Sequence, residues 1–152
     1  MESYPGIKLL RLRPEADCDI PLPCYMIPGS AGMDLAAAIE QDLTLKKGER
    51  YLMPTGIAIA LPNGYEAQIR PRSGLAVKHG IGIINSPGTI DADYRGEIMI
   101  PVINLGLRDY TFHRGDRIAQ MVIKPAFQVK IELVEKLEPT ERNTGGFGHT
   151  GT

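Results

Sequence analysis

The sequence predicts an all-β fold, a β-sandwich or barrel-like body with one short helix, and three observations support this prediction. The 17 glycines and 12 prolines are spread along the chain and break it into short segments. Several of these segments alternate apolar and polar residues with a period of two, as half-buried strands do. At 152 residues, the chain has the length of one domain with a full hydrophobic core.

The strands are expected where apolar residues alternate or run together. The predicted strands cover residues 7–13, 57–61, 65–70, 81–84, 98–100, 117–123 and 128–133. Residues 62–64 (Pro-Asn-Gly) and 113–116 (His-Arg-Gly-Asp) have the composition of turns between strands. A single helix is expected, with Ser73 as its N-cap, residues 74–79 as its body and Gly80 as its stop.

Composition narrows the class of protein. A net charge of -1 does not favour a nucleic acid polymer as partner, so a phosphate-bearing partner is expected to be small. The chain has no apolar run long enough for a membrane span and no signal peptide, which favours a cytoplasmic protein. In that compartment Cys18 and Cys24 are expected to be free thiols, although a small disulfide is the alternative.

Two segments have residues suited to phosphate chemistry. Pro71-Arg72-Ser73-Gly74 places an Arg and a hydroxyl at a helix start, where N–H groups favour an anion. An ordinary helix cap with a surface Arg explains the segment equally well. In residues 85–96, Asp91 and Asp93 flank a loop tip and are suited to activating water or binding a divalent cation. The alternative is a polar loop without chemistry, and spacing does not choose between the two carboxylates.

Three further segments are less specific. The Gly-rich residues 142–151 have the composition of an arm that closes over a ligand, or of a disordered tail. Gln120 lies in a predicted strand and either presents its amide to a site or is partly exposed. Asp34 stands among small apolar residues, so it is expected either to pair with an Arg behind a site or to cap a turn.

Taken in order, these five segments resemble the five motifs of the trimeric deoxyuridine triphosphate nucleotidohydrolases, the dUTPases. The motifs are A-G-M-D-L (31–35), P-R-S-G-L-A (71–76), N-x-x-G-T-I-D-A-D-Y-R-G-E (85–97), R-I-A-Q-M (117–121) and R-N-T-G-G-F-G-H-T-G (142–151). Each motif is weak alone, but all five in this order form a specific signature. The resemblance covers the chain from about residue 26 to its C-terminus.

The resemblance implies a role for each matching residue. Asp91 is the implied general base, Asp93 has no such role, and Asp34 is a supporting carboxylate behind the phosphate site. The implied substrate-binding residues are Arg72, Ser73, Gly74 and Gln120 for the phosphates, Asn85, Gly88, Ile90 and Met99 for uracil, Tyr94 for the deoxyribose, and Arg142, Phe147, Gly148 and Thr150 in the closing arm.

The resemblance also implies an activity and an assembly. The expected reaction is hydrolysis of dUTP to dUMP and pyrophosphate by attack of water at the α-phosphorus, with Mg²⁺ held by the substrate's phosphates. In the family this reaction supplies dUMP for thymidylate synthesis and keeps uracil out of DNA. We expect one dUTPase domain over residues 1–152, a jelly-roll subunit in a homotrimer with shared active sites, and residues 141–152 as the flexible arm that closes over one of them.

One departure and two rival interpretations accompany this resemblance. His149 stands where many relatives have Ser, and we do not expect it to be catalytic. A dCTP deaminase of related fold would have its catalytic Glu five residues after Gly96, where this chain has Pro101. A β-sandwich binding or shell protein fits the composition as well, and only the polar residues of the five segments argue against it.

Overall fold

The computed structural model describes residues 5–146, which form eleven strands and one short helix. The strands are β1 (Lys8–Arg11), β2 (Met33–Ala36), β3 (Leu43–Leu45), β4 (Arg50–Pro54), β5 (Ile57–Ala60), β6 (Tyr65–Pro71), β7 (Ile81–Ile83), β8 (Gly88–Ile90), β9 (Met99–Asn104), β10 (Tyr110–Phe112) and β11 (Arg117–Pro125). The helix α1 (Ser73–His79) lies between β6 and β7. No helix in the described part of the chain is long and apolar enough to cross a membrane.

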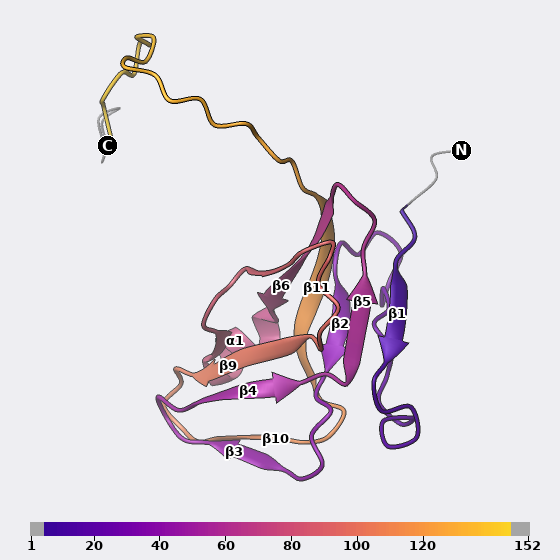
Figure 1. The fold of residues 1–152 in the computed structure, drawn as a ribbon. Coiled ribbons are helices and arrows are strands. Elements are labelled where there is room, and N and C mark those ends of the chain that lie inside the picture. Colours follow the sequence, from indigo (N-terminus) through magenta and orange to yellow (C-terminus); the bar gives the residue numbers. More distant parts are fainter. Residues whose placement is uncertain (1–4, 147–152) are drawn as a thin grey trace.

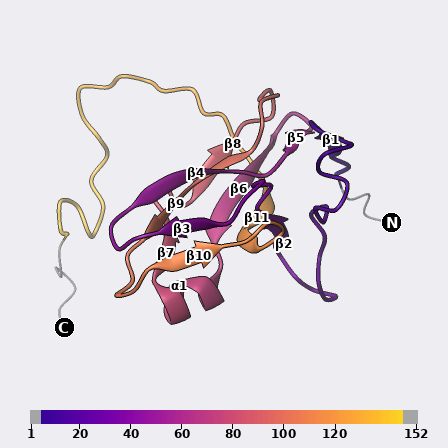
Figure 2. The same cartoon turned by 90° about the horizontal axis from the view of Figure 1, so that it is seen from below.

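Two sheets form the body. One has four strands in the order β2-β11-β6-β8, the other has three in the order β4-β9-β7, and all pairs are antiparallel (Figures 1 and 2). Their inner side chains share one core, in which Leu35 and Met121 of the first sheet join Met53, Ile100 and Val102 of the second. The pairs β1-β5 and β3-β10 complete the body. The predicted all-β, jelly-roll-like class is therefore confirmed.

Strand β6 lies in the middle of the larger sheet. Ile69 is opposite Met121 of β11 on one side and Gly88 of β8 on the other. Ala67 and Ile69 are buried, whereas Gln68 lies on the outer face, where its amide donates to Glu66 and accepts from Arg70. This alternation confirms the period-two prediction for residues 65–70, and it fixes which side chains face the core.

Helix α1 ends as predicted and begins one residue away from the prediction. Gly80 has a left-handed backbone (φ 69°), and its N–H donates to Ala76 O at 2.9 Å. The N-cap, however, is Arg72, which makes no side-chain capping hydrogen bond, so the prediction of Ser73 as N-cap is wrong. Arg72 follows β6 directly and still has extended backbone angles, which makes Ser73 the first helical residue.

Two other predictions differ from the structure. Residues 128–133 form no strand, although they alternate as a strand would, because no part of the described chain lies beside them to pair with. Val129, Ile131 and Leu133 are 79%, 89% and 99% exposed, and the chain here leaves the body (Figure 1). Conversely, the region expected as one wide loop contains strand β8, which pairs with β6.

A buried carboxylate joins the N-terminal segment to the body. Asp17 is 1% exposed and pairs with Arg13 (2.8 Å) and Arg114 (3.2 Å). Arg114 also pairs with Asp19 at 2.7 Å, which holds the pKa of that carboxyl below its usual range. Asp17 lies against Gly56, whose N–H donates to the Glu97 carboxylate at 2.7 Å. The N-terminal segment thereby supports the loop that ends at Glu97.

Replacing Arg114 tests this junction. Arg114→Met leaves the buried Asp17 with Arg13 as its remaining charged partner, so we expect the free energy of unfolding to fall clearly below that of the wild type. Urea unfolding measures the change. Arg50→Met is the matched control, because Arg50 is exposed at the start of β4, and we expect a loss within about 0.5 kcal/mol. Equal losses in the two variants would contradict a special role for Arg114.

Candidate active site

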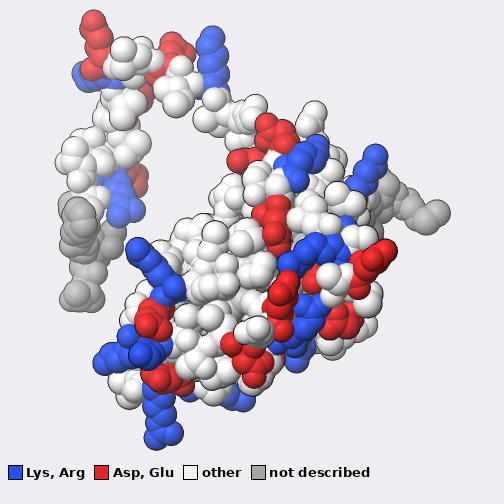
Figure 3. Space-filling model, turned by 60° about the horizontal axis from the view of Figure 1, so that its bottom comes forward, with Lys and Arg blue, Asp and Glu red and all other residues white. Residues whose placement is uncertain are grey.

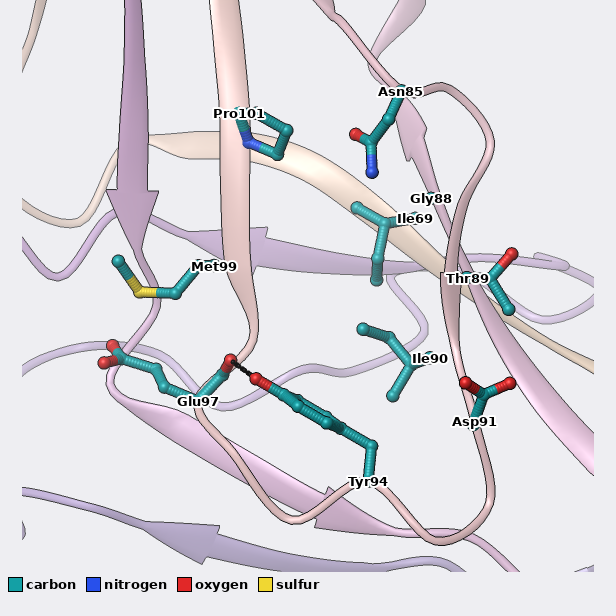
Figure 4. Close-up of a pocket in the computed structure, with 10 residues that line it drawn as sticks. All are labelled: Ile69, Asn85, Gly88, Thr89, Ile90, Asp91, Tyr94, Glu97, Met99 and Pro101. Carbon is teal, nitrogen blue, oxygen red and sulfur yellow. Dashed lines mark hydrogen bonds between the residues drawn. The ribbon is translucent and has the colours of Figure 1, made fainter.

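A pocket lies between the β8 segment and the start of β9 (Figure 4). Its volume of about 220 Å³ is below the roughly 300–1,000 Å³ of sites for drug-sized ligands, so it fits one ring system rather than a whole nucleotide. Ile69 of β6 forms part of its wall. Six residues singled out in the sequence line it together: Asn85, Gly88, Ile90, Asp91, Tyr94 and Met99.

The backbone of β8 offers hydrogen-bonding groups to this pocket. β8 is the last strand of its sheet, and β6 pairs with one of its edges. Within the described residues, the other edge has no strand partner, and such an edge presents free N–H and C=O groups. Gly88 is buried, and a Cβ atom added there would lie 3.5 Å from Asn85 Nδ2, so the Asn85 amide lies close to the β8 backbone.

The two carboxylates of the loop, Asp91 and Asp93, differ in the cavities that they border. Asp91 borders the pocket and also a second, open cavity of about 630 Å³, whereas Asp93 borders only the second one. Asp91 is exposed, so water reaches its oxygens. The Tyr94 N–H donates to the Asp91 carbonyl at 3.2 Å, which closes the turn between them. Of the two, therefore, only Asp91 borders the pocket.

Tyr94 lines the pocket between Asp91 and Glu97. Its hydroxyl donates to the Glu97 carbonyl at 3.0 Å, as Figure 4 shows, and its side chain stays 43% exposed. Arg95 donates to the carbonyls of Ala92 (2.7 Å) and Tyr94 (2.8 Å), so its guanidinium braces the same loop. One face of an aromatic ring is thus presented to whatever occupies the pocket.

A cationic cluster forms at the start of α1. Asp34 bridges two guanidinium groups, with Arg72 at 3.2 Å and Arg117 at 3.1 Å, and Arg72 also donates to the Arg117 carbonyl at 3.1 Å. Gln120 donates to Pro71 O at 3.1 Å, and its amide packs against Gly32. Ser73 and Gly74 follow and are exposed. Two cations and one carboxylate leave a net positive charge beside the first N–H groups of the helix, which suits an anion.

The pocket and the cationic cluster do not merge in one chain. The pocket-lining residues of the described chain do not include Arg72, Ser73, Gly74 or Gln120. Arg142 is exposed and donates to Gly145 O at 2.8 Å within its own segment. Phe147, Gly148, His149 and Thr150 lie outside the described residues.

Sequence reasoning missed some members of the site. Glu97, Thr89 and Pro101 also line the pocket, and Arg117 is the second partner of Asp34. Arg117 opens the motif that contains Gln120, and this position in the motif was the available signal in the sequence. In the structure Arg117 lies opposite β2, the strand that contains Asp34. Among the described residues, no group of three or more His, Cys, Asp or Glu side chains is placed to hold a metal ion.

A jelly-roll-like body with a ring-sized pocket beside an edge strand, and with an arginine pair at a helix start, suits an enzyme whose substrate combines a ring with anionic groups, as a nucleotide does. The comparison with known families agrees. The model of the dUTPase family matches residues 19–151, and the chain belongs to this family.

Curated relatives and solved structures support the same assignment. The chain is 60% identical over 131 residues to a deoxyuridine 5'-triphosphate nucleotidohydrolase of Finegoldia magna, covering 86% of this chain and 92% of the relative. It is 54% identical to the enzyme of that name from Syntrophotalea carbinolica, covering 95% and 96%. Among structures, the dUTPase of Staphylococcus bacteriophage 80alpha with dUpNHpp superposes with a TM-score of 0.85 at 26% identity, covering 97% of this chain and 99% of the other.

The bridge made by Asp34 is testable by a shape-conserving change. Asp34→Asn keeps the volume but leaves Arg72 and Arg117 facing each other without the shared carboxylate. We expect the free energy of unfolding to fall by about 1–2 kcal/mol. Asp42→Asn is the control, because Asp42 is exposed and pairs only loosely with His113 at 3.6 Å. If thermal unfolding showed no difference between the two variants, the bridge would contribute nothing to stability.

Proposed function

We propose that this protein hydrolyses dUTP to dUMP and pyrophosphate, and that it thereby supplies dUMP for thymidylate synthesis and keeps uracil out of DNA. One observation carries the proposal. In a chain of the dUTPase family, Asp91 borders a ring-sized pocket together with Asn85, Gly88, Ile90, Tyr94 and Met99. The pocket takes the uracil, the cationic cluster takes the phosphates, and Asp91 acts as the general base.

Uracil is read by the free edge of β8. An edge strand offers alternating N–H and C=O groups at fixed spacing, and a pyrimidine edge presents matching acceptors and donors. Cytosine has a donor where uracil has an acceptor, so one buried group would be left unpaired. Asn85 supplies an additional amide at the closed end of the pocket. Thymine would be excluded by its methyl group, through the shape of the pocket.

Tyr94 selects the deoxyribose. Its ring lines the pocket beside Asp91 and Glu97 (Figure 4), and we infer that the sugar attached to the base packs against this ring. A ring packed against the C2′ side of the sugar leaves no space for a 2′-hydroxyl. The hydrogen bond to Glu97 keeps the ring from rotating away.

The phosphates bind to the cationic cluster and the arm. Arg72, Ser73 and Gly74 present a guanidinium, a hydroxyl and helix N–H groups, Gln120 adds an amide, and Arg142 brings a second guanidinium from the arm. Mg²⁺ would come with the substrate rather than bind to a protein ligand, as the resemblance to the dUTPases implies. It would reduce the negative charge that repels an incoming nucleophile.

Asp91 takes the proton of the attacking water. Asp91 is exposed to solvent and borders the pocket, so a water molecule can reach it beside a bound nucleotide. General base catalysis of this kind contributes about 10²–10⁴-fold in rate. Asp93 does not border the pocket, and we assign it no role as the general base.

The complete site requires a homotrimer. In one chain the pocket and the cationic cluster are separate, and the apolar row of residues 127–137 is exposed. We infer that each site takes its pocket from one subunit, the cationic cluster with Arg72 from a second subunit, and the arm of residues 141–152 from a third. Packing on a neighbour would bury the row that lacks a partner in its own chain.

The surface charges bear on the kind of substrate, and the two cysteines bear on the compartment. On the face seen in Figure 3, Lys and Arg are interspersed with Asp and Glu, which favours a small substrate over a nucleic acid polymer. Cys18 and Cys24 are free, as in a reducing compartment, which supports a cytoplasmic location.

The rival deamination of dCTP would need a proton carrier at residue 101, where Pro101 lines the pocket.

Exchange of Asp91 tests the function and the base together. The wild type should release pyrophosphate from dUTP and far less from dCTP, UTP or dTTP. Asp91→Asn should bind a non-hydrolysable dUTP analogue almost normally but turn over at least about 100-fold more slowly. Asp93→Asn is the matched control, two residues away, and should remain active. A near-normal rate in Asp91→Asn would remove Asp91 from its role, and ammonia release from dCTP would establish the rival.

Truncation separates closure from assembly. Deleting residues 141–152 should abolish hydrolysis while sedimentation still shows trimers, because the apolar row remains. Deleting residues 127–152 removes the row as well, and we expect it to weaken the trimer. Monomers in the shorter deletion would instead make the arm an assembly element.

A further inference from the structure

Gly96 lies directly beneath the ring of Tyr94. A Cβ atom added at residue 96 would overlap the Tyr94 hydroxyl oxygen and would lie 2.5 Å from Cζ and 3.0 Å from Cε2. Folded proteins do not tolerate such distances, so the ring occupies its position only because residue 96 has no side chain. The backbone of Gly96 is outside the left-handed region, unlike that of Gly56 or Gly64. The requirement at residue 96 is therefore space and not backbone conformation.

The far end of the ring is fixed by the next residue. The Tyr94 hydroxyl donates to the Glu97 carbonyl at 3.0 Å, and the Glu97 carboxylate accepts from Gly56 N–H at 2.7 Å. Ile98, which follows, is fully buried, and its N–H donates to Ile57 O at 2.9 Å. Residue 97 is thus tied to the body, whereas the outer face of the Tyr94 ring is open to solvent. A side chain added at residue 96 would therefore push the Tyr94 ring toward solvent, because residue 97 on the other side is held in place.

We propose that Gly96 is a positioning residue for sugar selection. Its missing side chain sets how far the Tyr94 ring reaches over the pocket, and therefore whether a 2′-hydroxyl is admitted. The inference rests on the proposed hydrolysis of dUTP and on Tyr94 as the sugar-facing ring.

The size of the effect follows from the distances. Moving the ring from 2.5 Å to an ordinary contact of 3.4 Å requires a shift of about 1 Å, which breaks the hydrogen bond to Glu97 O. Misplacement of a positioning group by that much changes rates by about 100-fold in enzymes. The shift acts on the sugar and leaves the base edge and the phosphates in contact with their own groups.

The test is the selectivity of Gly96→Ala. We expect the ratio of kcat/KM for dUTP to that for UTP, measured by pyrophosphate release, to fall at least about 10-fold. Gly82→Ala is the matched control, because an added Cβ there meets Ile103 at 3.7 Å and Leu105 at 3.9 Å, which are ordinary contacts. An unchanged ratio in a folded Gly96→Ala protein overturns the inference.

A double-mutant cycle distinguishes positioning from general damage. In a Tyr94→Ala background there is no ring to displace, so adding Gly96→Ala should leave the ratio as it is in Tyr94→Ala alone. If Gly96→Ala does not fold by itself, the double variant should fold, because the overlap is gone. A double variant that remains unfolded, or that loses as much selectivity again, overturns the proposal. A wild type that does not hydrolyse dUTP refutes the proposed function instead.

Discussion

The pairing of β6 with two neighbours is the constraint on which the site depends. On one edge β6 carries β11, which brings Arg117 and Gln120 to the start of α1, and on the other it carries β8, which forms the wall of the pocket. β6 then runs directly into Arg72. Because side chains alternate along a strand, a slip of one residue would turn Ile69 outward and move the whole cationic cluster. The register of β6 therefore fixes the pocket wall and the cationic cluster through the backbone hydrogen bonds along its two edges.

Features governed by local rules were predictable from the sequence. The alternation in residues 65–70 identified β6, and Gly80 marked the end of the helix. For Asp34 the sequence offered an Arg partner or a turn cap, and the structure shows the Arg partner. Each depends on a period, a backbone angle or a charge that a few residues contain. Motif order added what local rules lack, because it brought together side chains that the chain separates by many residues.

Features governed by long-range contact were not predictable in this way. Three residues of β8 have no detectable period, and they form a strand because β6 lies beside them. Val129, Ile131 and Leu133 have the period of a strand but no partner within the described chain, so a correct pattern gave a wrong element. Asp91 and Asp93 are equivalent by composition, and only the position of the pocket on one side of the loop separates them.

Gly96 shows that an absent side chain also carries structural information that a sequence does not reveal. A glycine after Arg95 in a polar loop is typical of a turn, yet its backbone has no need of glycine, and the demand comes from a ring two residues earlier. The same loop continues through Glu97 to Gly56, where a second close approach is made by the buried Asp17. The charged network at the N-terminus and the ring at the pocket are thus ends of one chain of contacts. The positions of the Asp17 carboxylate and of the Tyr94 ring therefore share the same support, since both side chains lie where an added Cβ at a glycine would collide with them.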